Sequence, residues 1–290
     1  MALTLVIHAA PSHRARVEVS IKRAIQFPLG SMLTKSQIES FVERGYIKIP
    51  GAVPRVIVDA ARKAINHSIG AVGQGSDDLE NFKTGAYCDE LKNQAVMTDL
   101  YNRTPVMSIA EQLIGEGKVQ PVRHVQMARR FPTVMNGERE DPRGHLDGLG
   151  NGKNGQAKGM YRRGFMAFAV IYLADVPEPY SGNFTVWPKT HRFFEDYFKE
   201  NGTDVLKEGT PKVPLPDPPI QICGEASDAV IAHHQIVHTG GPNASPDIRY
   251  AAITRLRHVD CDEVGQDAYT DIRREWEGVG EAEEEAVLSA

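Results

Sequence analysis

Apolar residues in the first 115 positions recur mainly at helical spacing. This spacing predicts helices over residues 34–45, 54–70 and 106–113, the first of which is closed by Gly45. Residues 46–49 instead alternate as in a short strand. We therefore expect the N-terminal third of the chain to be mainly helical.

From residue 119 onward the pattern changes to short runs of β-branched and other apolar residues, separated by turn-forming residues. Many short strands with such turns are typical of β-sandwiches and β-barrels. We expect an α+β fold in which a double-stranded β-helix, or jelly-roll barrel, is buttressed by the N-terminal helices. The expected strands cover residues 119–131, 165–176, 182–188, 219–223, 228–238 and 249–258.

The two ends of the chain differ from its middle in composition. A Pro-Leu-Gly break ends at Gly30, so residues 1–30 are predicted to be an N-terminal extension. Residues 276–290 are acidic and poor in apolar side chains, which predicts a frayed tail. Residues 31–275 are then expected to form a single jelly-roll domain.

The N-terminal extension is basic. It carries Arg14, Arg16, Lys22 and Arg23 against the single acid Glu18, a bias that organelle-targeting peptides share. No basic residue precedes its short apolar run, so a secretory signal fits poorly. A solvated or edge-pairing extension is the simpler interpretation; we expect a cytoplasmic protein and leave organelle targeting open.

Composition excludes several classes of partner. The 290 residues are 41% hydrophobic and 24% charged, with a net charge of −5, so nothing favours binding to nucleic acid or an anionic membrane. No stretch approaches the roughly 20 consecutive apolar residues of a membrane span. The three cysteines form no CxxC motif, which argues against a disulfide framework and a cysteine-based zinc site.

The first candidate for chemistry is a histidine and a carboxylate two residues apart. His145 and Asp147 lie in the glycine-rich segment 141–155. On a strand, such a pair points to the same face and can grip one side of a metal ion. A further histidine would complete the two-histidine, one-carboxylate triad of non-haem iron oxygenases. An HxD pair alone is weak evidence.

The C-terminal part supplies candidates for the third ligand. If residues 228–238 form one strand, His234 and His238 share a face and His233 points the other way. The turn that follows favours His238. Eleven residues later, Arg249 opens the next strand, and a guanidinium there can pair bidentately with the carboxylate of a co-substrate.

These segments together resemble the phytanoyl-CoA dioxygenase family of Fe(II)/2-oxoglutarate oxygenases. Residues 33–54 are similar to the family's N-terminal block, HLD at 145–147 occupies the place of its iron motif, and residues 233–251 are similar to the segment with its distal histidine and arginine. Residues 182–192 resemble the strand that ends in Pro-Gly-Ser-His, with Lys189 in place of that glycine.

The resemblance, which spans roughly residues 33–258, implies a set of roles. Fe(II) would bind His145, Asp147 and His238, and 2-oxoglutarate would bind Arg249. The resemblance does not place the polar residue that assists this arginine; Gln126, in the strand expected over residues 119–131, is the candidate. The implied reaction is hydroxylation of a C–H bond with O2, releasing succinate and CO2, with ascorbate as a reductant. Since halogenases of this kind lack the carboxylate ligand, Asp147 argues against chlorination.

Substrate contacts are assigned less sharply. The candidates are His124, Arg130 and His234. Arg129 and Arg130 are adjacent on a strand, so at most one faces the pocket. His191 is expected to have a structural role. The expected partner is a small-molecule substrate, and a monomer or weak homodimer is the default state. The alternatives are a cupin-like protein with another metal and a non-catalytic jelly-roll binding protein.

Overall fold

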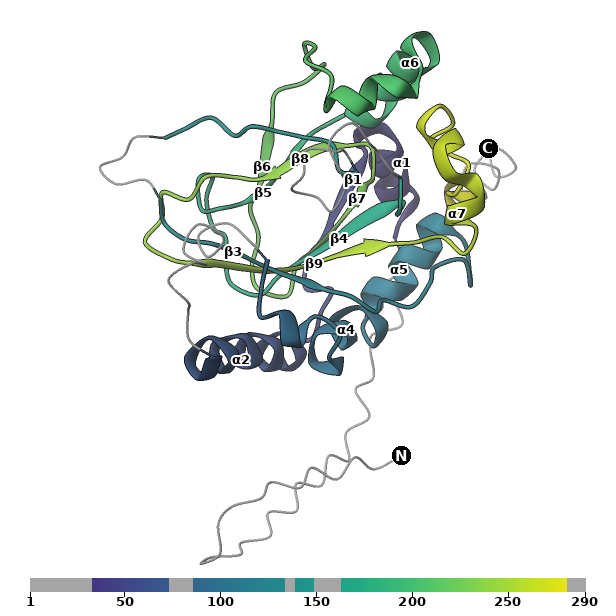
Figure 1. Cartoon of the computed structure of the whole chain (residues 1–290). Coiled ribbons are helices and arrows are strands. Elements are labelled where there is room, and N and C mark those ends of the chain that lie inside the picture. The colour runs from purple at the N-terminus through teal and green to yellow at the C-terminus, as the bar shows by residue number, and fades with distance from the viewer. Residues whose placement is uncertain (1–32, 73–85, 134–138, 149–162, 281–290) are drawn as a thin grey trace, which may run out of the picture. The chain divides into compact units, whose positions relative to one another are not determined.

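The helices of the N-terminal third form where the apolar spacing predicts them (Figure 1). Helix α1, Lys35–Arg44, begins with a capping box in which the Thr34 hydroxyl accepts from the Gln37 backbone N–H. It ends at Gly45, whose φ of 80° is left-handed. Strand β1, Tyr46–Ile49, and helix α2, Arg55–Val72, follow. The computed structural model describes residues 33–72, 86–133, 139–148 and 163–280.

The segment after α2 contains short elements that the apolar spacing does not predict. Residues 73–85 of this segment lie outside the described residues. Its remainder contains β2, Ala86–Tyr87, and the 3-10 helix η2, Asp89–Leu91. The sequence pattern also missed α4, Ala95–Asn102, which precedes the predicted helix, α5, Pro105–Ile114.

A six-stranded antiparallel sheet forms the centre of the unit that comprises residues 31–290. Besides β1 and β2, its strands are β3, Gln126–Arg130; β4, Ala167–Tyr172; β7, Ala229–His233; and β9, Arg249–Leu256. Their order in the sheet is β1-β7-β4-β9-β3-β2. The middle strand β4 is buried at every position, as its unbroken apolar sequence requires.

A second, three-stranded antiparallel sheet lies against the inner face of the first. It has the order β6-β5-β8, with β6 at Ile220–Ile222, β5 at Phe184–Trp187 and β8 at Val237–Gly240. One buried cluster contains residues of both sheets. The Tyr172 hydroxyl also joins them, since it donates to the Ile222 carbonyl at 2.7 Å and accepts from the Phe184 N–H at 3.1 Å.

The sheets do not form a closed barrel within the described residues. Between the two sheets, pairing is limited to isolated bridges such as Val176 with Gly224. The predicted strand over 228–238 is also wrong, because β7 belongs to the large sheet and β8 to the small one. The chain turns at residues 234–236, where the Ile236 N–H donates to the His233 carbonyl at 3.1 Å. This turn invalidates the strand parity expected for His234 and His238.

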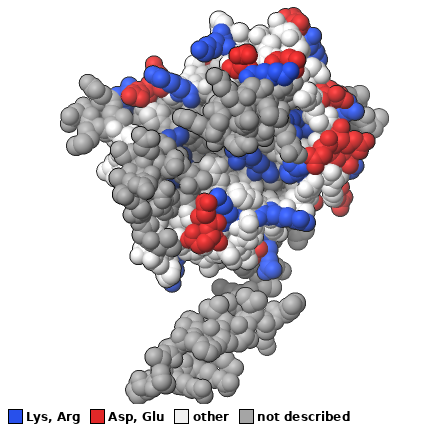
Figure 2. All heavy atoms as spheres, viewed as in Figure 1, with Lys and Arg blue, Asp and Glu red and all other residues white. Residues whose placement is uncertain are grey.

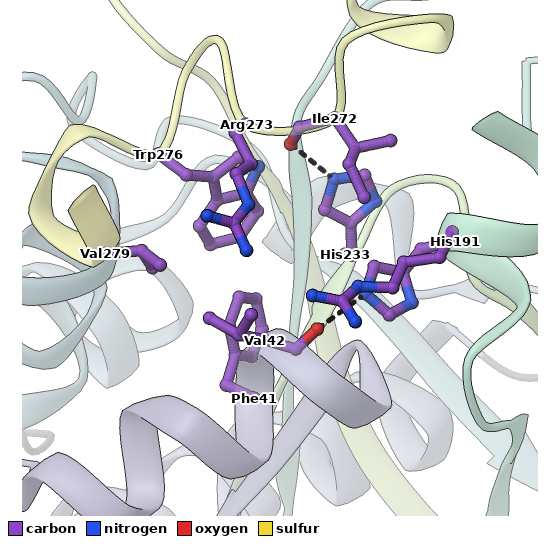
Figure 3. Close-up of a pocket in the computed structure, with 9 residues that line it drawn as sticks. Phe41, Val42, His191, His233, Ile272, Arg273, Trp276 and Val279 are labelled. Atoms are coloured by element: carbon purple, nitrogen blue, oxygen red, sulfur yellow. Dashed lines mark hydrogen bonds between the residues drawn. The ribbon is translucent and has the colours of Figure 1, made fainter. Parts of the chain in front are cut away.

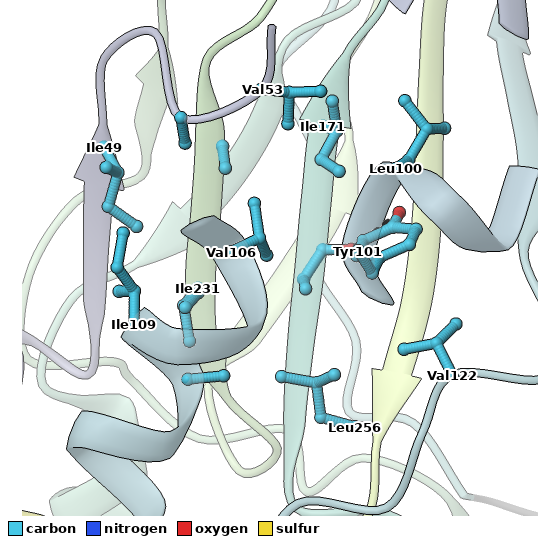
Figure 4. Close-up of a cluster of buried hydrophobic side chains, with 14 of the residues drawn as sticks. Ile49, Val53, Leu100, Tyr101, Val106, Ile109, Val122, Ile171, Ile231 and Leu256 are labelled. Atoms are coloured by element: carbon cyan, nitrogen blue, oxygen red, sulfur yellow. Dashed lines mark hydrogen bonds between the residues drawn. The ribbon is translucent and has the colours of Figure 1, made fainter. Parts of the chain in front are cut away.

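Helices α2, α4 and α5 cover the outer face of the large sheet (Figures 1 and 4). Figure 4 shows Leu100, Tyr101 and Ile109 of these helices facing Ile171 and Ile231 of the sheet. The Tyr101 hydroxyl donates to the Ala169 carbonyl at 3.3 Å, which satisfies a polar group in this apolar layer. Because these helices cover the outer face, a functional site on this sheet would lie on its inner face.

The C-terminal segment is packed against the domain beyond the predicted boundary at residue 275. Trp276 and Val279 are buried in the core, and the Trp276 ring lies 4.8 Å from Phe41 and 5.3 Å from His233 (Figure 3). A fully buried ion pair between Arg163 and Glu275 fixes the same segment. The acidic composition hid these anchors, and the packed region extends at least to Val279.

The remaining elements are α6, Thr190–Asn201; the 3-10 helix η3, Thr203–Glu208; α7, Cys261–Val264; and η4, Gly265–Tyr269. Residues of α6, η3 and η4 form a buried cluster with Trp187 of β5 and Val237 of β8. No described helix is both long and apolar enough to cross a bilayer. Basic and acidic side chains of described residues are interspersed on the face that Figure 2 shows.

Two buried histidines make the fold sensitive to acid. His191 Nε2 lies 3.1 Å from the Val42 carbonyl, and His233 Nε2 lies 3.2 Å from the Ile272 carbonyl (Figure 3). Burial lowers the pKa of His191 to about 4 and the pKa of His233 well below its usual value. Both are therefore neutral in the folded protein at neutral pH.

We predict that stability is highest above pH 6.5 and falls as the pH drops from about 6.5 towards 4, because the unfolded state then binds more protons. At pH 5 the protonation of His191 on unfolding should lower the free energy of unfolding by about 2 kcal/mol. Urea unfolding of the metal-free protein at pH 7.5 and 5.0 measures this loss of stability. His191→Gln should reduce the difference between the two pH values; an unchanged difference would contradict the assignment.

Candidate metal centre

A short antiparallel bridge brings two histidines together. The His145 N–H donates to the His238 carbonyl at 3.0 Å, and the His238 N–H donates to the His145 carbonyl at 3.1 Å. Their ring centroids are 4.7 Å apart. Gly144 permits this close approach, since a Cβ there would overlap the side chains of Val237 and Trp187. The bridge thus places the HxD motif, residues 145–147, beside the first half of β8.

Asp147 completes a cluster of three possible metal ligands. Its Oδ1 lies 3.4 Å from His145 Nε2 and 4.0 Å from His238 Nε2. One ligand atom from each residue lies within 4.8 Å of those of the other two. Two imidazole nitrogens and one carboxylate oxygen on one side of a site are the donor set of a facial triad. The residues therefore fit a divalent iron ion.

His238 is oriented for coordination through Nε2. Its Nδ1 lies 3.1 Å from the Ile236 carbonyl, which can only accept, so Nδ1 carries the proton and Nε2 keeps its lone pair. Burial, followed by the nearby His145, lowers the pKa of His238 to about 4. The ring also packs against Phe168 at 4.2 Å between centroids. His238 is thus a neutral, rigidly held ligand at neutral pH.

Arg255 holds the second oxygen of Asp147. Its Nε and Nη2 donate to Asp147 Oδ2 at 2.9 and 2.5 Å. The guanidinium lies over the Phe165 and Phe168 rings, at 5.6 and 5.8 Å from their centroids. With Oδ2 engaged, Oδ1 is directed towards the two histidines. Arg255 was not among the residues predicted from the sequence, although its even spacing from Arg249 places both on one face of β9.

The charge of Asp147 is stabilised in a buried position. Its side chain is only 3% exposed, and burial alone would raise its pKa. In the acidic range where Asp147 titrates, the hydrogen bond with His145 and the charges of protonated His238 and of Arg255 outweigh burial, so its pKa lies well below the usual range. Asp147 is therefore an anion at neutral pH, as a ligand for a divalent cation must be.

Arg249 lies on the same inner face, farther from the candidate ligands. It is 4% exposed, and its Nε and Nη1 donate to the carbonyls of Gly182 at 2.6 Å and Ala128 at 3.0 Å. Burial lowers its pKa to about 10, so it remains a cation at neutral pH. Its Nη2 points towards Gly240, two residues beyond His238 on β8. Since two residues of a strand span about 6.6 Å, Gly240 lies about this far along β8 from the candidate ligand His238.

The other predicted residues are scattered. Gln126 lies at the Asp147 end of the sheet, where its Oε1 is 3.4 Å from Arg255 Nη1, and it is four residues along β3 from the partner of Arg249. His124 is exposed, with Nδ1 3.2 Å from Asn93 Oδ1. His234 is buried beside His233, at 4.5 Å between ring centroids. Only Arg130 adjoins Arg249 directly.

Similarity to known proteins is confined to structure. No family model matches the sequence, and no curated protein matches it. The solved structure of SnoK, a non-haem alpha-ketoglutarate-dependent carbocyclase from nogalamycin biosynthesis, is similar with a TM-score of 0.52 and 18% identity, over 77% of this chain and 83% of SnoK.

Two Streptomyces proteins are similar to the same extent. HygX of Streptomyces hygroscopicus, solved with nickel and 2-oxoglutarate bound, has a TM-score of 0.52 and 16% identity, over 78% of this chain and 88% of HygX. AviO1 of Streptomyces viridochromogenes Tue57 has a TM-score of 0.51 and 17% identity, over 78% and 95%. The chain shares the fold of these proteins.

We predict that Asp147→Asn weakens Fe(II) or Ni(II) binding by at least about a hundredfold, because the amide removes the anionic donor while keeping its volume. Calorimetric titration of the apo protein with Ni(II) measures the affinity. Asp59→Asn, at an exposed position of α2, is the matched control. Equal affinities of the two variants would refute the ligand assignment.

Removal of the Arg255 guanidinium should free Asp147 to rotate. We predict that Arg255→Gln weakens Ni(II) binding roughly tenfold, the usual effect of losing a group that orients a metal ligand. Arg255→Lys should recover part of the affinity, whereas Arg103→Gln, at an exposed position after α4, should have no effect. Unchanged binding in Arg255→Gln would show that Asp147 is oriented without it.

Proposed function

We propose that the protein is an Fe(II)/2-oxoglutarate-dependent oxygenase of the phytanoyl-CoA dioxygenase type, with a jelly-roll fold whose two sheets are open at their edges. The observation that carries the proposal is the placement of a histidine–aspartate–histidine cluster and a buried arginine on one inner face, about two strand residues apart. The shared fold with SnoK and HygX supports it. A metal-binding protein without a co-substrate would not need Arg249.

The proposed cofactors follow from the chemistry of the residues. His145, Asp147 and His238 would hold Fe(II), and Arg249 would bind the distal carboxylate of 2-oxoglutarate. When bound, iron, 2-oxoglutarate and O2 supply an oxidative decarboxylation that releases succinate and CO2 and oxidises a C–H bond of the substrate. Ascorbate is the proposed reductant. Gln126, beside Arg255, would act at the metal-binding end rather than beside Arg249.

The chain's own residues supply geometry and electrostatics. Arg255 fixes the rotamer of Asp147, and the Ile236 carbonyl fixes the tautomer of His238. Phe168 and Phe184 pack around His238 and keep water away from its ring. Arg249 stays charged in its buried position and orients an incoming carboxylate.

The resemblance of the turn after β5 to the family's Pro-Gly-Ser-His segment has structural support. Lys189 stands at the glycine position and has a φ of 65°, in the left-handed region that glycine prefers. His191 follows it and contacts the Val42 carbonyl, which links this turn to α1. A left-handed backbone at this position is what a glycine there would favour, and it supports the proposed family type.

The proposed substrate is a small molecule, and hydroxylation is the proposed outcome. HygX, which shares the fold, has also been solved with hygromycin B bound, with a TM-score of 0.51. Ring closure is the second candidate, since SnoK is a carbocyclase. Candidate substrate contacts are Arg130, His124 and His234; His124 is exposed near Arg255, and His234 is buried. We further propose a cytoplasmic monomer or weak homodimer.

Anaerobic reconstitution with Fe(II) and 2-oxoglutarate tests the proposal. We expect a weak visible metal-to-ligand absorption band, followed by succinate formation when O2 is admitted with a panel of small molecules. Arg249→Gln should raise the 2-oxoglutarate concentration needed for the band roughly tenfold to a hundredfold, because it removes a charged carboxylate partner. Absence of both the band and succinate from the wild-type protein would overturn the oxygenase assignment.

A further inference from the structure

A second arginine lies beside Arg249 on the inner face of the large sheet. Arg130 of β3 and Arg249 of β9 are directly opposite each other in the antiparallel register. Directly opposed residues point to the same side of a sheet. Their side is the inner one, because Ala251, two residues from Arg249, belongs to the cluster shared by the two sheets.

The two guanidinium groups converge on one glycine. A Cβ on Gly240 would lie 2.7 Å from Arg130 Nε, 2.9 Å from Arg130 Nη2 and 3.1 Å from Arg249 Nη2. A Cβ on Gly182 would lie 2.9 Å from Arg130 Cβ and 3.1 Å from Arg249 Cβ. Gly182 thus packs on the stems of both arginines, and the absence of a side chain at Gly240 lets both guanidinium groups lie against the β8 backbone.

No acidic side chain of the described residues contacts either guanidinium. Among the described residues, the partners of Arg249 are the carbonyls of Gly182 and Ala128, which accept from its Nε and Nη1, and Nη2 has no hydrogen-bond partner. Burial lowers the pKa of Arg130, and burial together with the charge of Arg130 lowers the pKa of Arg249. Two like charges held together away from water are costly unless an anion joins them.

The position of the pair relative to the metal ligands limits which anion fits. Gly240 follows His238 by two residues on β8, and both face the inner side. The span along the strand is about 6.6 Å, which is comparable to the length of a five-carbon dicarboxylate. A small inorganic anion would fill the arginine end alone, whereas a 2-oxo diacid reaches both ends.

We infer that Arg130 joins Arg249 in binding the distal carboxylate of the co-substrate, so that two arginines from neighbouring strands hold this one group. The inference rests on the proposed function and adds Arg130 to its co-substrate site. Arg130, which the sequence offered as a candidate substrate contact, would then bind the co-substrate instead.

Calorimetry with the Ni(II)-loaded full chain tests the site without turnover. The probes are 2-oxoglutarate and 2-oxobutyrate, which lacks the distal carboxylate. We expect Arg130→Gln to weaken 2-oxoglutarate binding roughly tenfold and 2-oxobutyrate binding less than about twofold, since only the first ligand reaches the pair. Arg130→Lys should recover part of the loss. Arg103→Gln, whose side chain is 75% exposed, is the matched control.

Gly240→Ala provides a second test that leaves both arginines in place. The backbone of Gly240 is not left-handed, so alanine fits the chain but puts a methyl group between the two guanidinium groups. We expect this variant to lose 2-oxoglutarate binding and keep its Ni(II) affinity. Together the two variants separate loss of the site from loss of folding.

Unchanged 2-oxoglutarate affinity in Arg130→Gln, or equal weakening of both acids, would overturn the two-arginine site while leaving the oxygenase proposal intact. So would normal 2-oxoglutarate binding by Gly240→Ala. Failure of the wild-type protein to bind either acid would instead overturn the proposed function, and this inference with it.

Discussion

The alternation of side chains along β9 is the constraint on which the site depends. Because alternate residues of a strand share a face, Arg249 and Arg255 both point inward, one at each end of the strand. Arg255 holds the carboxylate of Asp147 in the candidate metal cluster, and Arg249 lies at the other end of the strand, beside Gly240. A shift of one residue in the register of β9 would turn both outward. The pairing of β9 with β4 and β3 therefore positions the whole site.

The fold was predictable where one local pattern determines one element. The apolar stripe and capping residues of α1 are contiguous in sequence, and so is the buried run of β4. The break between β7 and β8 was not predictable, because an unbroken apolar and histidine-rich run crosses from one sheet to the other. Nor was Trp276, whose burial depends on Phe41 and His233, far away in the sequence.

In the candidate site, too, the residues marked by short-range signals were predictable and those that depend on distant residues were not. The grouping of His145, Asp147 and His238 could be inferred because HxD spacing and a histidine before a turn are short-range signals. Arg255 could not, because its role depends on Asp147, which lies over a hundred residues earlier. Gly240 is informative only once β8 is set against β3 and β9, since its missing side chain matters through two arginines of other strands.

The three candidate ligands differ in their contact with solvent. The side chain of His145 is 40% exposed, whereas those of Asp147 and His238 are 3% and 8% exposed. His238 is held by its neighbours, and Asp147 by Arg255. A cation would therefore enter and leave past His145, the one ligand free to swing aside. We therefore expect the mobility of the His145 imidazole to govern how fast a bound metal exchanges.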